Sequence, residues 1–404
     1  MKVKLSKKIV FLMVMALVVA LAAACGAQPA DEQSGDQSGD ENTAVESVKI
    51  GLNYELSGAV ATYGGNTVKG IEMAAKEINE SGGVLGGAKI ELIKYDNKSD
   101  AAEATNVQTK LITVDGVVAS IGPATSTNTL AAIPVSMDNQ VPLLTPSGTA
   151  DMVTVDEATG KAKEYAFRLC FYDSFQGSVG ANFIFNSLQL KKAAVYVDTN
   201  SDYSKAIGEV FKKTFTELGG EIVAEENYVN TDQDFKPTLT RIKSANPEVI
   251  YLPGYYNNVG LIVKQAREMG ITVPFVGADG YDSPDLVKLG GAENLNNVFF
   301  TNHYSSQDTD PNVQKFVEAF KAANGDEPDA FAALGYDAMY LMADAINRAG
   351  KADPEAIKDA LAATQDFAGV TGTLSMDENH NPVKAVVILE LKDGVQTFRD
   401  KILP

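Results

Sequence analysis

The sequence of 404 residues contains no tryptophan, only two cysteines and only two histidines. No H-E-x-x-H, C-x-x-C or G-x-S-x-G segment occurs, so common zinc-protease, thiol-redox and serine-hydrolase signatures are missing. We expect His303, in an apparent strand, and His380, in a polar turn, to be structural or solvated. The scarcity of these residues excludes a histidine-based triad, and we predict neither an enzyme nor a bound cofactor.

Basic side chains are outnumbered by acidic ones. The sequence has 34 lysines and arginines and 53 aspartates and glutamates, which gives a net charge of −19. Nucleic acids require basic patches, so we do not expect a nucleic-acid partner. After residue 24, no apolar run approaches the roughly 20 residues that a membrane-spanning helix needs. We therefore expect a soluble body.

Two segments bear a partial likeness to ion-binding or phosphate-binding loops. The glycine-rich segment 82–89 lacks the G-K-[ST] ending of a phosphate loop and leads from a helix to a strand, which is the reverse of the required order. Segment 198–209 has acidic residues at calcium-loop spacing, but Tyr203 stands where the sharp turn needs glycine. We predict a turn for the first, a helix cap for the second, and no metal site.

The first residues have the pattern of a secretory signal. Four lysines lie within residues 2–8, an uncharged apolar stretch covers residues 9–24, and small residues precede Cys25. A cysteine at this point resembles the lipobox of bacterial lipoproteins, in which the thiol is acylated and the peptide is cut before it. We predict a signal peptide at 1–24 and lipidation at Cys25, with two acyl chains sufficient for stable anchoring. The alternative is a plain signal peptide with an incidental cysteine.

Residues 25–46 are polar and acidic with almost no apolar side chains, so we predict a disordered linker there. Strand-like and helix-like runs alternate after it, which is typical of βαβ units and parallel sheets. Two such series are too many for one open sheet of ordinary width, so we predict an α/β protein with two doubly wound lobes and a cleft between them. The predicted strands are 48–54, 89–95, 116–122, 141–146, 193–198, 221–229, 248–254, 274–279 and 297–304.

Hydroxyl side chains follow two strands of the first lobe. Ser126 and Thr127 stand at a predicted helix start, and Ser147, Gly148 and Thr149 follow the next strand. Ligands of open α/β sheets bind beyond the carboxyl ends of the strands, and a helix N-terminus attracts anions. These residues therefore predict a carboxylate site, although simple helix capping would also explain either segment.

Aromatic side chains and one carboxylate follow the strands of the second lobe. Tyr203, Tyr255 and Asp279 come after the first, third and fourth of these strands. Phenol faces and a carboxylate suit an ammonium group, and Tyr63 of the first lobe would cover an apolar group. The combination predicts a clamp for a zwitterion, while surface packing would be the favoured explanation for each tyrosine taken alone.

Six segments then establish a family resemblance. They are SGAVATYGGNTVKGIEMAAKEINESGGVLGG, IGPATSTNT, PLLTPSGT, DTNSDYSKA, GYYNN and VGADG, in this order. Over about residues 47–400 the chain resembles the branched-chain amino-acid-binding proteins of ABC importers, which have the type I periplasmic binding fold. On this basis we assign one lobe to 47–168 plus 302–368 and the other to 169–301 plus 369–404.

The resemblance implies a role for each matching residue. Ser126, Thr149 and the backbone around Ser147 would hold an amino-acid carboxylate and share in holding the ammonium group. Asp279 would pair with the ammonium, where relatives often have the longer glutamate. The side-chain pocket or cleft closure would involve Tyr63, Tyr203, Tyr255 and Phe331.

The resulting hypothesis is a monomeric lipoprotein on the extracytoplasmic face of the bacterial membrane. It captures an L-amino acid, with leucine, isoleucine or valine expected, and delivers it to an ABC permease and ATPase. One alternative is an amino-acid sensor without transport. Another is an importer receptor for an aromatic amino acid, an amide or urea, although a neutral ligand would leave Asp279 unpaired at a cost of about 1–3 kcal/mol.

Overall fold

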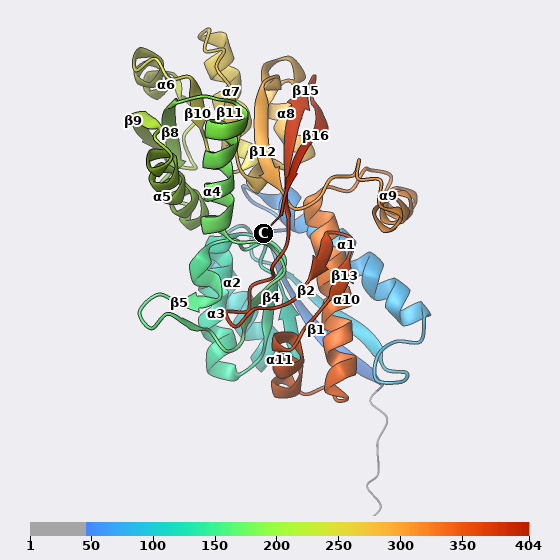
Figure 1. Ribbon diagram of the computed structural model, residues 1–404. Helices are drawn as coiled ribbons and strands as arrows, with labels where there is room; N and C mark the ends of the chain where they lie inside the picture. The colour runs from blue at the N-terminus through green and yellow to red at the C-terminus, as the bar shows by residue number, and fades with distance from the viewer. Residues whose placement is uncertain (1–45, 404) are drawn as a thin grey trace, which may run out of the picture. The chain divides into compact units, whose positions relative to one another are not determined.

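The computed structural model describes residues 46–403, which contain two large β-sheets (Figure 1). The first sheet has five parallel strands in the order β2-β1-β3-β4-β7. Their bounds are β1 (Ser47–Tyr54), β2 (Lys89–Asp96), β3 (Ala119–Ile121), β4 (Leu143–Thr145) and β7 (Ala166–Arg168). Strands β3, β4 and β7 are buried throughout, as expected for a sheet with both faces covered.

The second sheet has seven strands in the order β16-β15-β12-β11-β10-β8-β9. Their bounds are β8 (Lys192–Asp198), β9 (Glu221–Tyr228), β10 (Val249–Tyr251), β11 (Phe275–Gly277), β12 (Val298–Asn302), β15 (Val386–Lys392) and β16 (Val395–Ile402). The prediction of a parallel sheet is confirmed for β8 to β12, whereas β15 and β16 pair antiparallel. Asp393 and Gly394 connect this pair with positive φ angles of 51° and 79°, and so short a turn can join only antiparallel strands.

Helix α1 (Ala61–Glu80) packs against α10 (Ala330–Ala349), although the two are far apart in the sequence (Figure 1). A Cβ atom on Gly70 would lie 2.0 Å from the Ala332 carbonyl oxygen, and one on Gly335 would lie 2.2 Å from the Thr67 carbonyl oxygen. Only glycine permits this backbone approach at either position. The contact brings the segment after β12 back to the first sheet.

Side-chain caps begin many of the remaining helices. Asp100 caps α2, since its carboxylate accepts from the Glu103 backbone N–H at 2.9 Å, and Ser201 caps α5 in the same way. None of the helices within residues 46–403 has the length and hydropathy of a membrane span. The helices are α2 (Ala101–Thr113), α3 (Ser126–Asn139), α4 (Asp173–Asn182), α5 (Asp202–Glu217), α6 (Lys236–Ser244), α7 (Tyr256–Glu268), α8 (Pro284–Gly290), α9 (Pro311–Asn324) and α11 (Pro354–Ala362).

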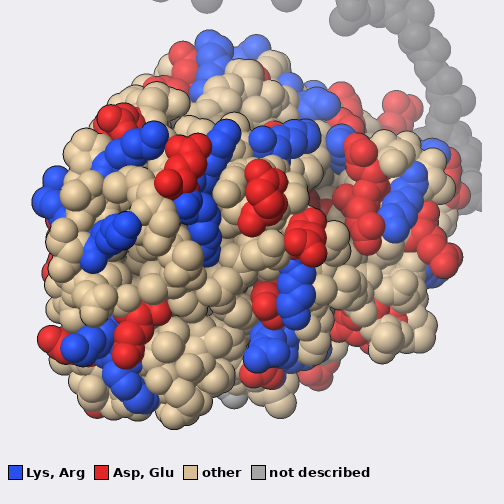
Figure 2. All heavy atoms as spheres, turned by 90° about the horizontal axis from the view of Figure 1, so that it is seen from above, with Lys and Arg blue, Asp and Glu red and all other residues tan. Residues whose placement is uncertain are grey.

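The chain passes between the two sheets three times, after β7, after β12 and before β15 (Figure 1). Cys170 lies in the first of these crossovers rather than in a strand, and burial raises the pKa of its thiol to about 12. The predicted signal peptide, Cys25 and nearly all of the predicted linker lie outside the described residues. On the face that Figure 2 shows, basic and acidic side chains are interspersed.

Candidate ligand-binding site

A small cavity is lined by residues that follow strands of both sheets. Seven of the predicted site residues line it, together with Ala124, Thr125 and Gly280. The seven are Tyr63, Ser126, Ser147, Tyr203, Tyr255, Asp279 and Phe331. The structure therefore brings together side chains that are separated by as much as two thirds of the sequence.

One wall of the cavity is made of hydroxyl groups from the first sheet. Ser126 is the first residue of α3, and its Oγ accepts a hydrogen bond from the Ala150 N–H at 3.1 Å. Ser147 Oγ donates to the Ala124 carbonyl at 2.9 Å, so the loops after β3 and β4 hold each other. No side chain caps the N-terminus of α3, where Thr125 is the N-cap residue. That terminus remains suited to an anionic group.

Glu55 holds the loop after β3 in place through hydrogen bonds, a role that we did not predict from the sequence. Its buried carboxylate accepts from the backbone N–H groups of Ala124 and Thr125 at 3.0 and 3.1 Å. It also accepts from Thr125 Oγ1 and Asn128 Nδ2, each at 2.8 Å. An acidic residue directly after the buried strand β1 was the available sequence signal, since such a charge needs strong donors.

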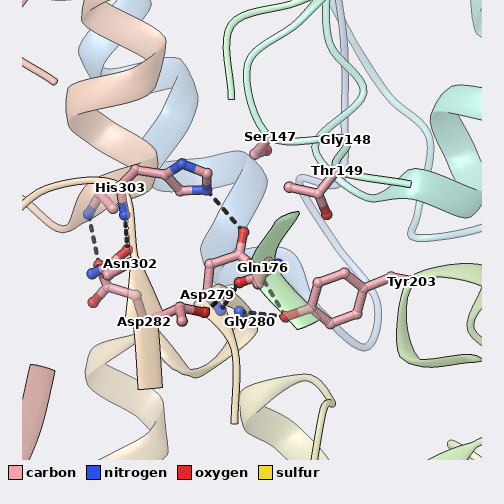
Figure 3. A network of polar contacts seen from close by, with 12 residues as sticks. Ser147, Gly148, Thr149, Gln176, Tyr203, Asp279, Gly280, Asp282, Asn302 and His303 are labelled. Carbon is pink, nitrogen blue, oxygen red and sulfur yellow. Dashed lines mark hydrogen bonds and ion pairs between the residues drawn. The ribbon is translucent and has the colours of Figure 1, made fainter. Parts of the chain in front are cut away.

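The opposite wall carries the carboxylate of Asp279, which follows β11 and is buried (Figure 3). Tyr203 donates its hydroxyl proton to Asp279 Oδ1 at 2.8 Å, and His303 Nε2 lies 3.0 Å from Oδ2. The Asp279 N–H donates to Gln176 Oε1 at 2.9 Å. Each carboxylate oxygen is thus oriented by one donor and keeps acceptor capacity for a ligand.

His303 contributes to this wall as a neutral donor. Its ring is buried and stacks on Phe171 with centroids 3.7 Å apart, and burial lowers its pKa. The contact with Asp279 requires the proton on Nε2, because a carboxylate can only accept. His303 therefore orients the carboxylate without cancelling its charge. We expected His303 to be either structural or solvated, and the solvated alternative is wrong because the ring is buried.

Four aromatic rings form the rest of the lining. Tyr63 stacks on Phe331 with centroids 4.2 Å apart, and Tyr203 stacks on Tyr255 at 5.1 Å. Tyr63 and Tyr255 meet edge to face at 5.6 Å, which joins the two pairs. The Tyr63 hydroxyl donates to the Gly280 carbonyl, so α1 reaches a loop of the second sheet. These rings offer an apolar surface beside the carboxylate.

Three predicted site residues are not among those that line the cavity. Thr127 Oγ1 lies 3.1 Å from Asp202 Oδ2 and so connects α3 to α5. A Cβ atom on Gly148 would lie 2.8 Å from Thr145 Oγ1, so glycine is required there for packing of the loop. The Thr149 hydroxyl is buried and has no hydrogen-bond partner within residues 46–403.

Further hydrogen bonds connect elements of the two sheets around the cavity. Thr62 Oγ1, on α1, donates to Asp285 Oδ2, on α8, at 2.6 Å, and the Tyr256 hydroxyl donates to Thr62 Oγ1 at 3.1 Å. We call the Thr62–Asp285 and Thr127–Asp202 contacts the interlobe latch. Within the described part of the chain, no cluster of three or more histidine, cysteine, aspartate or glutamate residues is suited to a metal ion.

Two α/β sheets joined by three crossovers, with a small polar and aromatic cavity between their strand ends, define a solute-binding protein. The periplasmic binding protein family matches residues 47–396, and the chain belongs to that family.

Relatives and solved structures agree with this assignment. The leucine-, isoleucine-, valine-, threonine- and alanine-binding protein of Pseudomonas aeruginosa is 32% identical over 335 residues, covering 83% of this chain and 87% of that protein. The leucine-binding protein LivK of Thermotoga maritima has a TM-score of 0.83 at 36% identity, covering 88% of this chain and 99% of that one. The branched-chain amino acid transporter substrate-binding protein LivJ of Streptococcus pneumoniae, in complex with isoleucine, has a TM-score of 0.82 at 40% identity, covering 89% and 99%.

Proposed function

We propose that this protein is the receptor of an ABC importer and captures a branched-chain L-amino acid for delivery to a permease and ATPase in the same membrane. The single observation that carries this proposal is the buried Asp279 carboxylate across the cavity from Ser126, Ser147 and the uncapped N-terminus of α3. One wall suits an anion and the other suits a cation, as a zwitterion requires.

In this proposal the ligand carboxylate binds at Ser126, Ser147 and the α3 N-terminus, and its ammonium group binds Asp279. The ligand side chain packs against the rings of Tyr63 and Phe331. The names of the relatives support leucine, isoleucine or valine, since the Pseudomonas protein is named for these and two further small amino acids, and the Streptococcus structure holds isoleucine.

The proposal includes a lipid anchor at Cys25, after removal of residues 1–24, on the extracytoplasmic face of the membrane. Residues 47–168 plus 302–368 form one lobe, and residues 169–301 plus 369–404 form the other. The packing of α10 on α1 supports this division. The protein acts as a monomer and delivers the amino acid unchanged, without a cofactor.

Isothermal titration of the purified body with each L-amino acid tests the function. We expect saturable binding of leucine, isoleucine and valine, with weaker or no binding of charged amino acids. Preferred binding of an aromatic amino acid, an amide or urea would select the alternative importer. Absence of heat with every amino acid at millimolar concentration would overturn the amino-acid proposal.

A further inference from the structure

A groove of about 480 Å³ is separate from the ligand cavity, and no residue lines both. Residues of helices α1, α9 and α10 and of strand β13 (Phe367–Gly369) line it. Strand β13 and helix α10 lie beside α1 in Figure 1. The proposed function uses none of the side chains in this groove. Those that matter for its chemistry are Glu77, Phe316, Tyr336, Tyr340 and Phe367.

Glu77 is a carboxylate of α1 that has two donors and no cation. The hydroxyls of Tyr336 and Tyr340, one turn apart on α10, donate to its Oε2 at 2.7 and 2.8 Å. Burial, together with this carboxylate, raises the pKa of both phenols, so both remain neutral donors. Within residues 46–403, Glu77 Oε1 accepts no hydrogen bond and the carboxylate forms no ion pair. The groove therefore holds a negative charge with free acceptor capacity.

The other acidic residues of α1 differ from Glu77 in this respect. The Glu80 carboxylate lies 3.8 Å from Lys76 Nζ, and the Glu72 carboxylate lies 2.6 Å from Lys94 Nζ. A lysine of the chain thus accompanies both of these exposed carboxylates, whereas none accompanies Glu77.

Two further charged residues line the groove. Asp337 is buried and accepts from the Val370 and Thr371 N–H groups at 2.7 and 2.8 Å and from Thr371 Oγ1 at 2.7 Å, so it serves to hold the segment after β13. Lys315, on α9, is exposed and forms no ion pair with Glu77 in the described part of the chain. With two carboxylates and one ammonium group, the lining as a whole is negative.

Aromatic rings surround the Glu77 carboxylate. The ring of Tyr336 lies between those of Phe316 and Tyr340, with centroids 4.9 Å away in each case and planes tilted by 51° and 55°. Rings tilted in this way do not cover each other's faces as stacked rings do, and Phe367 adds a fourth ring to the lining. The faces of aromatic rings attract cations. We call Glu77 and these four rings the aromatic cage.

We propose that the aromatic cage binds a small alkylammonium compound. Its cationic nitrogen faces Glu77 Oε1, and its alkyl groups contact the rings of Phe316, Tyr336, Tyr340 and Phe367. A neutral ligand would leave the Glu77 charge without a partner, and an anion would be repelled by it. This second site does not depend on the capture of an amino acid between the two sheets.

The experiment uses choline as the cationic probe. Its matched analogue is 3,3-dimethylbutan-1-ol, in which carbon replaces the nitrogen, so the shape is kept and the charge is removed. Binding to the purified protein is followed through the tyrosine ring signals in NMR spectra. L-leucine is present at saturation to occupy the Asp279 site, and Asp279→Ala takes the place of leucine if leucine does not bind. We expect saturable choline binding at least tenfold tighter than that of the analogue.

Two variants assign the binding to Glu77. Glu77→Gln keeps an oxygen that accepts from Tyr336 and Tyr340 but removes the charge, so choline affinity should fall at least tenfold. Glu80→Gln, one turn further along α1 and outside the groove, should bind choline as the unaltered protein does. Leucine affinity should be the same in both variants.

Three outcomes would overturn the proposal: no saturable choline binding, equal binding of choline and its neutral analogue, or unchanged choline affinity in Glu77→Gln. Choline binding that occurs only in Lys315→Ala would also overturn it, because Lys315 would then fill the cage itself. The comparison of the two probes on the unaltered protein decides the matter even if Glu77→Gln fails to fold. Amino-acid binding is measured separately, so failure of this proposal leaves the proposed function standing, and the reverse also holds.

Discussion

His303 Nε2 lies 3.0 Å from Asp279 Oδ2, and Tyr203 donates to Oδ1 of the same carboxylate at 2.8 Å. The two donors come from separate segments, helix α5 and the loop after β12. Because both are neutral, the Asp279 charge is oriented but remains available to a cation.

Replacement of Asp279 tests the charge itself. Asp279→Ala should weaken amino-acid binding by about 1.5–3 kcal/mol, or roughly 10- to 100-fold, because a charge-assisted hydrogen bond to the ammonium is lost. Isothermal titration gives the affinity, and the melting temperature should stay within a few degrees of the original. Asp326→Ala, at an exposed position, is the control. Unchanged affinity would refute the ammonium role of Asp279.

Replacement of His303 tests the positioning of that charge. His303→Leu should lower leucine affinity by about 1–2 kcal/mol because Asp279 Oδ2 loses its donor, whereas His303→Gln should retain much of the affinity through its amide N–H. Titration with leucine and with 4-methylpentanoate, the leucine analogue that lacks the amino group, separates positioning of Asp279 from a general loss of structure. If His303→Leu and His303→Gln have the same leucine affinity, or if a variant loses affinity for both ligands equally, His303 does not position Asp279.

The interlobe latch joins elements of the two sheets, and we expect it to stabilise the form in which the two lobes are closed around a ligand. Thr62→Val removes the hydroxyl that donates to Asp285 and accepts from Tyr256, without touching the cavity lining. Loss of about 0.5–1.5 kcal/mol from the closed form should weaken binding up to roughly tenfold and raise the dissociation rate. Stopped-flow kinetics measures that rate, and Thr109→Val, whose hydroxyl bonds only to its own helix, is the control. An unaltered dissociation rate would contradict the latch.

Lys384 should give the protein an unusual pH dependence of stability. It is buried, and desolvation lowers its pKa to about 8, while its hydroxyl partner Thr371 lies 2.7 Å away. Between pH 8 and the ordinary lysine pKa, the folded state binds fewer protons than the unfolded state, so the free energy of unfolding rises with pH. From pH 8 to about pH 9.5, below the ordinary tyrosine pKa, this group contributes an increase of about 1.6 kcal/mol.

Urea unfolding at the two pH values measures that increase. In Lys384→Met the increase should be smaller by about 1.6 kcal/mol. Lys264→Met, at an exposed position, should retain it. An equal increase in the Lys384 variant and the unaltered protein would show that Lys384 does not carry the effect.

The lipid anchor is tested at Cys25. Cys25→Ala should release the protein into the medium or periplasm and reduce amino-acid uptake by cells, because a tethered receptor has a higher effective concentration at its permease. Affinity of the purified protein should not change. Retention of the variant in the membrane fraction, measured by immunoblot, would contradict lipidation at this residue.

The sequence by itself determined the order of the elements and most of the cavity lining. Hydrophobic periodicity is local, so α1 shows its buried face at Val68, Ile71 and Ala75, and the cap at Asp100 depends only on residues three positions apart. The ends of buried strands are local features as well. Because ligands of α/β sheets gather at those ends, the residues that follow them pointed to the cavity.

Only the tertiary structure decided which partners those residues have. Gln176 and Asp279 are 103 positions apart, and Glu55 lies 69 positions from the Ala124 N–H that it accepts from. The sequence around His303 has only the pattern of a strand, and the contact between its ring and Asp279 is visible only in the tertiary structure. No local pattern encodes such pairs, because they form where separate strands and crossovers converge and where burial leaves each polar group dependent on whichever partner the fold supplies.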